Sequence, residues 1–300
     1  MNAETIAKRF DKARREGRTW RFACPLCGKP KAWARNHHSE IKLGCWGCDD
    51  WKELRRIAFG DERSIKTVES LGRGKWWAKT EDEAAAAFSE VRLAQTLALW
   101  RRAPSIEGTL GARYLRSRGL DPDRFDLEAL RFSSMQWHWP SRSTWPALLA
   151  LVSTHEGREL SVHQTFLSLD GAGKAAIEKA RLYRAGLPIA GGGVWFGKAK
   201  PKGEFVIAEG IETTLASMAL YRKAAGCAAL SASGLAALIL PASVKRVRIC
   251  ADHDETGRGL VAARDACRRW RAEGRAVVVS MPNAIGDDMN DVLMRRQGLL

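Results

Sequence analysis

Three acidic side chains in the last third of the chain follow short apolar runs. Glu209 comes directly after the run FVIA and before Gly210, and Asp252 and Asp254 follow the run VRICA. Carboxylate oxygens are the ligands that Mg²⁺ prefers in proteins, where the ion often bridges them to substrate phosphates. One or two such ions would neutralise a triphosphate, position an attacking 3′-hydroxyl and stabilise the leaving pyrophosphate. The three acids therefore predict a catalytic site for nucleotide chemistry that binds Mg²⁺ or Mn²⁺.

The elements around these acids are of the kind that would bring them together. Beyond residue 203, short apolar runs alternate with longer amphipathic stretches, which is typical of a parallel β-sheet covered by helices. The carboxyl ends of parallel strands meet at one edge of a sheet, and residues two apart on a strand point to the same side, so Asp252 and Asp254 are expected to face Glu209. Taken alone, the Asp-His-Asp pattern is equally typical of solvated loop acids or helix caps. Its combination with Glu209 favours the metal site.

Four cysteines near the N-terminus form two CxxC pairs with 17 residues between them: Cys24, Cys27, Cys45 and Cys48. Four thiolates at this spacing complete a tetrahedral shell around one Zn²⁺, and a closed shell makes the metal structural. Four unrelated buried cysteines are the bland alternative, which the paired spacing disfavours. His37 and His38 lie in the intervening segment, and either could replace one of the thiolates. The sequence therefore predicts a small zinc-binding domain over residues 1–60.

The charge of the chain favours a polyanionic partner. The formal net charge is +15, and Lys and Arg that neutralise phosphates gain free energy by releasing condensed counterions. Around the cysteines, cations and aromatic residues alternate, which suits single-stranded nucleic acid because bases stack on aromatic rings. Trp33 and Arg35 are the expected surface contacts, whereas Trp46 and Trp51 are equally compatible with the small core of the zinc domain. Nucleic acid is the expected partner.

The chain is expected to divide into four segments. The first 19 residues have the pattern of a basic amphipathic helix within the zinc-binding domain. Residues 61–80 lack sustained periodicity and predict a linker. Residues 81–202 predict a mixed α+β subdomain that begins with a helix and contains a hairpin formed by PALLALVS and SVHQTFLSLD. Residues 203–300 predict the parallel α/β domain, so that the fold class is α/β with a zinc-ribbon-like module.

Composition excludes several classes of protein. Hydrophobic residues make up 45% of the chain and charged residues 28%, the balance of a folded soluble protein. No run approaches the roughly 18 apolar residues of a membrane span, and the charged N-terminus lacks the apolar stretch of a signal peptide. We therefore expect a cytoplasmic protein without a membrane partner.

Two parts of the sequence resemble a known family. The cysteine pairs are similar to the zinc-binding domain of DnaG-type bacterial primases, whose second pair has the form Cys-x-Gly-Cys, as in Cys45-Trp-Gly-Cys48. Many members have a histidine where this chain has Cys27. Strand-Glu-Gly-helix, then strand-DxDxxG-helix, then the acidic run Asp287-Asp288-Met-Asn-Asp291 resembles the Toprim domain of primases, topoisomerases and some nucleases over about residues 203–297. The compact arrangement is similar to primase-like proteins of phages and other mobile elements.

The resemblance also implies roles for individual residues. Glu209 would be an acid/base or metal-organising residue, Asp252 and Asp254 the principal metal ligands, and Asp288 or Asp291 an auxiliary acid. Primases of this type often carry a further acid at the position of Thr213, so a weakened or rearranged second metal site is implied. The segment ARYLRSRGL resembles the start of the primase catalytic core, and the basic residues that would then face template and nucleotide are Lys174, Lys179, Arg181 and Arg184.

The resemblance implies a DNA primase that makes short RNA primers on single-stranded DNA from nucleoside triphosphates, with a role in DNA replication. The sequence has no GxxxxGK[ST] loop, so a separate replicative helicase is the expected partner for unwinding. A Toprim nuclease and a non-catalytic, recombination-mediator-like DNA-binding protein are the alternatives, and the intact acids favour an enzyme. A topoisomerase is disfavoured because it needs a nucleophilic tyrosine on a large additional domain.

Overall fold

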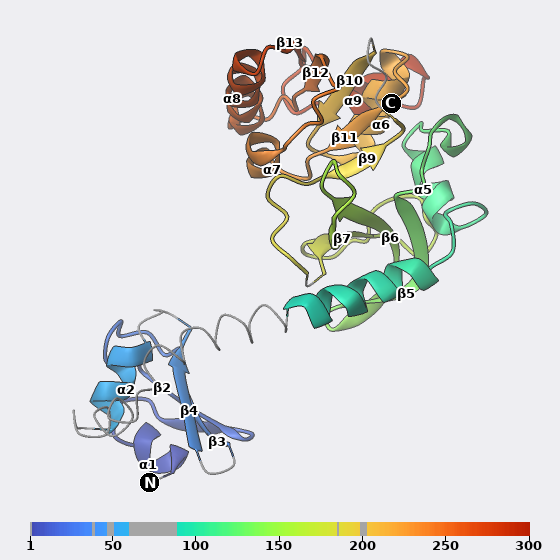
Figure 1. The fold of residues 1–300 in the computed structure, drawn as a ribbon. Helices are drawn as coiled ribbons and strands as arrows, with labels where there is room; N and C mark the ends of the chain where they lie inside the picture. The colour runs from blue at the N-terminus through green and yellow to red at the C-terminus, as the bar shows by residue number, and fades with distance from the viewer. Residues whose placement is uncertain (1, 38–39, 47–50, 60–88, 185, 199–202) are drawn as a thin grey trace. The chain divides into compact units, whose positions relative to one another are not determined.

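The computed structural model divides into two compact units, residues 1–84 and 85–300, which are described separately. The description covers the following residues: 2–37, 40–46, 51–59, 89–184, 186–198 and 203–300 (Figure 1). The linker predicted over residues 61–80 lies outside them, as do Cys48 and His38. Among the residues described, no helix is both long and apolar enough to cross a lipid bilayer.

The first unit contains a four-stranded antiparallel sheet in the order β1-β2-β3-β4. Its elements are α1 (Ala3–Ala7), β1 (Arg14–Glu16), β2 (Thr19–Phe22), β3 (Ala32–His37), β4 (Glu40–Cys45) and α2 (Trp51–Phe59). The helix predicted over the first 19 residues was therefore wrong. Gly17 adopts a φ of +62°, which glycine reaches without a steric penalty, and the turn there pairs Arg14 with Arg21. Phe10 stacks on Phe22 at 5.0 Å between ring centroids, so that α1 is held against the sheet after little more than one turn.

An antiparallel sheet forms the first part of the second unit, in the order β5-β6-β7-β8. The segment comprises α5 (Leu110–Ser117), the 3₁₀ helix η1 (Pro122–Arg124), β5 (Leu130–His138), β6 (Ser143–Ser153), β7 (Glu159–Phe166) and β8 (Arg181–Tyr183). The predicted hairpin is confirmed, because β6 pairs with β7 across a short turn. Residues 89–102 are helical, and this helix lies beside the antiparallel sheet (Figure 1). Leu99 and Trp100 of the helix pack against the core cluster that contains Leu149 and Phe166.

A five-stranded sheet follows in the order β13-β12-β10-β11-β9, in which only β9 is antiparallel to its neighbour. Its strands are β9 (Val194–Phe196), β10 (Glu204–Ala208), β11 (Gly226–Ala228), β12 (Arg246–Cys250) and β13 (Ala276–Ser280). Its helices are α6 (Ile211–Leu220), α7 (Ala232–Ala237), α8 (Arg258–Ala272) and α9 (Met289–Arg296). The predicted fold class, parallel α/β after a mixed α+β segment, is confirmed.

Helices cover both faces of this sheet, which explains the nearly continuous apolar runs of its strands. On β10, Val206 and Ala208 pack against α6 and α9, whereas Phe205 and Ile207 pack against α7 and α8. The first of these two cores also includes Tyr114 of α5 and residues of β5 and β6. The antiparallel segment and the parallel sheet therefore share one core.

Candidate active site

The strand order creates a crevice at the carboxyl end of β10. From β10 the chain passes through α6 to β11 on one side, and β12 then pairs with β10 on the other side. Ligands of open α/β sheets bind at such a reversal of strand order. Glu209 follows β10 directly, and Gly210 caps the N-terminus of α6. The topology therefore places the predicted glutamate at the point of the sheet that is best suited to a ligand.

A pocket of about 330 Å³ opens at this crevice. Its lining includes both acids and cations, from the parallel sheet, from α5 and from the β7–β8 segment: Glu209, Glu212, Asp252, Asp288, Arg118, Lys174 and Arg181. Acids that hold a divalent cation and cations that bind phosphate oxygens are the two components of a site for a metal-bound nucleotide. The composition of this pocket allows that chemistry.

Asp252 lies in the pocket with one carboxylate oxygen unpartnered among the described residues. This oxygen, Oδ1, is buried. Burial raises its pKa to about 7, and the neighbouring carboxylates Asp288 and Glu209 contribute to this shift. Burial and Asp254 likewise raise the pKa of Glu209. A buried, unpartnered carboxylate oxygen among like charges fits a divalent cation, which would supply the missing partner and neutralise the repulsion.

Asp254 differs from Asp252 in its surroundings. Strand β12 ends at Cys250, so the expectation that both aspartates alternate on one strand was wrong. Asp254 lies in the loop after the strand and accepts hydrogen bonds from the Thr256 hydroxyl and, at 2.9 Å, from the backbone N–H of Gly259. These bonds lower the pKa of Asp254 to about 2. It is therefore ionised at every physiological pH, whereas Asp252 holds a proton until about neutrality.

Gly259 lets the two loops approach each other. A Cβ on this buried glycine would lie 3.1 Å from Oδ2 of Asp254 and 3.3 Å from Oε1 of Glu209. Both carboxylates therefore face the same point at the start of α8. The predicted convergence of Glu209 with the aspartates has this structural basis.

Replacing Gly259 with alanine is expected to weaken divalent-metal binding about tenfold, because the methyl group would push apart two of the carboxylates. The fold should persist, since the backbone of Gly259 does not have a positive φ. Titration with Mn²⁺ measures the affinity. Gly173→Ala is the matched control, since Gly173 also lacks a positive φ and a Cβ there would meet nothing within 4 Å. Equal affinities of the two variants would contradict this role of Gly259.

The two auxiliary acids of the sequence prediction are placed differently. Asp288 lines the pocket, and its Oδ2 accepts a hydrogen bond from the Thr213 hydroxyl at 3.3 Å. Burial and Asp291 raise the pKa of Asp288. Asp291 does not line the pocket; its carboxylate accepts from the backbone N–H of Asp288 and lies 3.6 Å from Arg118. The structure thus brings Asp288 to Asp252, and it uses Asp291 in the capping box of α9.

The sequence analysis missed the role of Glu212. This side chain is buried, accepts a hydrogen bond from the Tyr114 hydroxyl and lies 3.3 Å from the Lys174 ammonium. Burial opposes ionisation, but Lys174 and the Tyr114 hydroxyl outweigh it and lower the pKa of Glu212 to about 2. This cluster joins α5 and the β7–β8 segment to α6. Its only sequence signal is an acid in the first turn of a helix, which usually reflects the helix dipole.

Tyr114→Phe is expected to destabilise the protein by about 1–3 kcal/mol, because Glu212 would lose a hydrogen bond while it remains buried. Urea unfolding at neutral pH measures the difference. Tyr183 provides the control, since among the described residues its hydroxyl has no hydrogen bond shown and its ring is 42% exposed. A Tyr114→Phe variant as stable as Tyr183→Phe would show that the buried cluster does not stabilise the fold.

Two of the four predicted basic residues reach the pocket. Lys174 and Arg181 line it. Lys179 lies 3.8 Å from Glu178, and the Arg184 guanidinium donates to the side-chain oxygen of Gln136 at 3.3 Å; neither is among the residues that line the pocket. Arg118 was not predicted, although it follows Tyr114 by one helical turn.

The N-terminal unit brings three of the four predicted thiols together. The Sγ atoms of Cys24, Cys27 and Cys45 lie within 4.8 Å of one another, and no other Cys, His, Asp or Glu group of the described residues is as tightly gathered. The tight turn at Cys24 is closed by a hydrogen bond from the Gly28 N–H to the Cys24 carbonyl. Three convergent sulfurs can hold a metal, and their donor type suits Zn²⁺. His37 is not in this group, and Cys48 lies outside the described residues.

Aromatic and basic residues alternate on the surface of this unit. Arg35 lies over the Trp33 ring at 5.7 Å, but Trp33 is half-buried against Gly44. Trp46, for which a core position and a surface position were equally expected, is 67% exposed, and Arg21 stacks on it at 3.9 Å. Trp46 therefore offers more ring surface to solvent than Trp33.

Comparison with known proteins places two segments of the second unit in families. Residues 204–298 match the Toprim domain, and residues 90–196 match a family described as a domain of unknown function, DUF7146. No curated protein matches this chain significantly.

Two solved structures are similar to this chain. The E. coli primase catalytic core is 18% identical with a TM-score of 0.39, and the match covers 64% of this chain and 71% of that one. The primase fragment of the bacteriophage T7 primase-helicase protein is 14% identical with a TM-score of 0.38, and the match covers 66% and 77% of the two chains. The Toprim resemblance expected from the acidic motifs is confirmed by the family match, which places a Toprim domain over residues 204–298.

Proposed function

We propose that this protein is a primase, which synthesises short RNA primers on single-stranded DNA by metal-dependent nucleotidyl transfer. The observation that supports this most is the buried, unpartnered Oδ1 of Asp252 beside Glu209 and Asp288, in a pocket that cations also line. Acids alone would suit many hydrolases. Acids that line the same pocket as Lys174 and Arg181 suit a substrate that carries several phosphates.

The residues of the pocket divide into two roles in this proposal. Glu209 and Asp252 would hold Mg²⁺ or Mn²⁺ together with Asp254, which lies in the loop after β12 and does not itself line the pocket, and Asp288 would lie beside them. The ion would supply charge neutralisation at the triphosphate and at the leaving pyrophosphate. Arg181 would orient the phosphate chain, and Lys174, which Glu212 holds at 3.3 Å, would keep a fixed position at the wall of the pocket. Because Asp252 has a pKa of about 7, metal binding would displace its proton near neutral pH.

The N-terminal unit would contact the template. The thiols of Cys24, Cys27 and Cys45, with Cys48 as the fourth by its sequence spacing, would bind one structural Zn²⁺. Trp46 with Arg21, and Trp33 with Arg35, pair an aromatic ring with a cation, which is the combination that binds unpaired bases and their phosphates. This unit would therefore hold single-stranded DNA by stacking and by charge.

The test incubates the protein with single-stranded DNA, labelled ribonucleotides and Mg²⁺ or Mn²⁺. Short labelled oligoribonucleotides that disappear in Asp252→Asn and in Glu209→Gln would support the proposal. Asp265→Asn is the control, because Asp265 is an exposed acid of α8 that pairs with Arg268 and does not line the pocket. Degraded template without oligoribonucleotides would instead indicate a Toprim nuclease, and bound DNA without either product would indicate a non-catalytic DNA-binding protein.

A further inference from the structure

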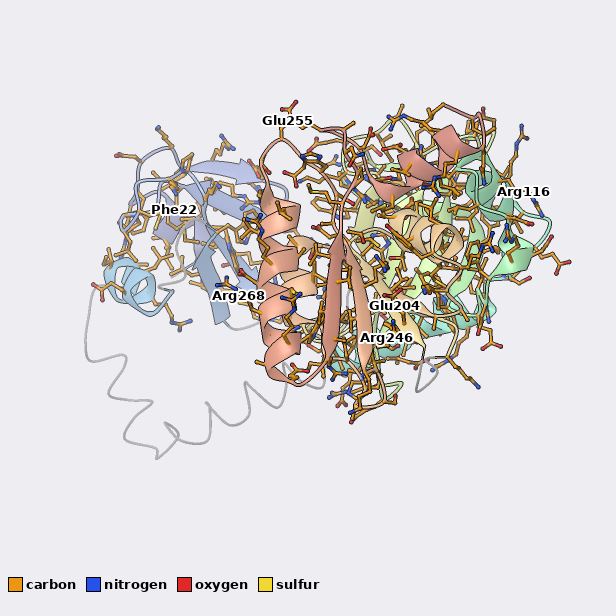
Figure 2. The ribbon with its side chains drawn as sticks, turned by 90° about the horizontal axis from the view of Figure 1, so that it is seen from above. Phe22, Arg116, Glu204, Arg246, Glu255 and Arg268 are labelled. Carbon is orange, nitrogen blue, oxygen red and sulfur yellow. The ribbon has the colours of Figure 1, made fainter. Side chains whose placement is uncertain are left out.

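A second pocket, of about 300 Å³, lies at the end of the parallel sheet opposite to the acidic site. It is formed where β10 and β12 begin, at Glu204 and Arg246, and where α6 ends. Figure 2 shows Glu204 and Arg246 together at one end of these strands, and Glu255, in the loop after β12, at the other end. The two pockets are therefore separated by the length of the strands.

Cations dominate this second pocket. Four line it, Lys198, Arg222, Lys223 and Arg246, together with a single acid, Glu204. The Glu204 carboxylate is already matched, since Lys223 and Arg248 each lie 3.1 Å from it and Arg248 bonds to both of its oxygens. For the other three cations no ion pair is formed within the described part of the chain. The pocket thus has a surplus of positive charge that no acid of the described residues neutralises.

The negative end of the α6 dipole balances only part of this positive charge. The C-terminus of a helix carries a partial negative charge of about one half, which a single cation such as Lys223 offsets. Arg222 adopts a φ of +53° at a position after the helix where glycine is usual, and an L-residue there costs about 1–2 kcal/mol. A glycine would end the helix at a lower cost, so the presence of arginine suggests that its side chain has a role of its own.

The geometry of β9 brings the fourth cation to the same place. Gly197 has a φ of +62°, and a Cβ there would lie 2.1 Å from the carbonyl oxygen of Ala224. Only glycine can occupy this position without a clash. The close approach of Gly197 to Ala224 places the next residue, Lys198, beside the end of α6. The chain therefore uses three separate segments, which follow β9 and α6 and begin β12, to surround one pocket with cations.

We propose that this pocket is a second phosphate-binding site, which takes consecutive phosphates of a nucleic-acid strand or the phosphate chain of a free nucleotide. Guanidinium and ammonium groups are the side chains that bind phosphate oxygens best. The one aromatic residue in the lining, Phe205, is buried in the core, so no exposed ring of the lining could stack on a base. Recognition would therefore depend on phosphate and would be independent of sequence. The site is separate from the proposed catalytic pocket and does not depend on it.

The test measures binding rather than activity, in the full-length protein and without added Mg²⁺. The variant is Arg222→Gln/Arg246→Gln, and the ligands are a fluorescent single-stranded oligonucleotide and, separately, pyrophosphate and ADP. The control is Arg264→Gln/Arg268→Gln, which removes the same charge from the exposed surface of α8 in the same domain. The single variant Arg246→Gln is included because it is expected to fold normally, since Arg246 is exposed and has no ion pair among the described residues.

We expect the double variant to bind the oligonucleotide at least about tenfold more weakly than the control variant, with a salt dependence reduced by about two phosphate contacts. The single variant should show a smaller loss in the same direction. If pyrophosphate or ADP displaces the oligonucleotide from the wild type but not from the double variant, the pocket takes free phosphate chains as well. If it does not, the site takes the strand alone. Losses equal to those of the control variant, for every ligand, would overturn the proposal.

Discussion

Replacing Asp252 with asparagine is expected to stabilise the metal-free protein at pH 8 by about 2–4 kcal/mol, although it should also abolish metal-dependent activity. The pKa of this carboxyl is about 7 in the folded protein against an ordinary value of 3.8. A tenfold change in an acid dissociation constant corresponds to about 1.4 kcal/mol, so the difference between these two pKa values sets an upper limit of about 4 kcal/mol. Asparagine would have nearly the same shape without the charge.

The pH range of this effect follows from the sign of the shift. A carboxyl whose pKa is raised on folding does not destabilise the folded protein at pH values below its unfolded pKa, because it is then protonated in both states. As the pH rises from the unfolded pKa to the folded pKa, the free energy of unfolding decreases. The wild type should therefore lose stability relative to Asp252→Asn between about pH 4 and pH 7, and the difference should then remain constant. Thermal or urea unfolding at several pH values, without divalent metal, measures it. Mg²⁺ or Mn²⁺ should stabilise the wild type and leave the variant unchanged.

Asp254→Asn supplies a control with the opposite sign. Hydrogen bonds from Thr256 and Gly259 lower the pKa of Asp254 to about 2, so its stabilisation is present above about pH 4 and is lost as the pH falls through 2. The asparagine variant should therefore be less stable than the wild type at pH 8. If both variants were destabilised at pH 8 with parallel pH profiles, Asp252 would not carry the unfavourable charge that the structure assigns to it.

The contrast between these two aspartates also shows what the sequence could not predict. The apolar runs and the acids that follow them were sufficient to predict the parallel sheet and the approach of Glu209 to the Asp252 loop. The residue pattern did not predict how the two aspartate side chains are oriented. Strand β12 ends before both of them, and the start of α8 donates backbone N–H groups to Asp254 and not to Asp252. Such differences depend on where a strand ends, and this is decided by packing rather than by the residue pattern.

Glu212 shows a second limit. Its neighbours Tyr114 and Lys174 are distant in the sequence and belong to the segment that precedes the Toprim domain. An acid in the first turn of a helix has many explanations, and only the tertiary fold reveals that this one is buried between two segments. By contrast, the cysteines carried their information in their spacing, and three of them meet as the spacing predicted.

Removal of the zinc proposed for the N-terminal unit is expected to unfold that unit and to leave the second one folded. Among the residues of the first unit that the structure describes, the buried hydrophobic side chains form one small cluster: Ala3, Ile6, Ala7, Phe22, Cys24, Ala32, Ala34, Leu43, Leu54 and Ala58. A core of this size rarely supports a fold alone, whereas structural Zn²⁺ contributes about 10–16 kcal/mol in small domains. The second unit has its own larger cores, so its stability should not depend on the metal.

Cys45→Ser tests this dependence, because it removes one of the three convergent thiols. We expect freshly purified wild type to contain zinc near stoichiometry, the variant to contain little, and limited proteolysis of the variant to remove the first unit while residues 89–300 stay intact. Cys267→Ser is the control, because Cys267 is a buried cysteine of α8 that is not one of the three convergent thiols. This control variant should retain the metal. Wild-type protein that is free of zinc but resists the protease over residues 2–59 would show that the hydrophobic core suffices. The three cysteines would then be ordinary residues in and around the core, because a domain that folds without its metal does not require the cation to bring them together.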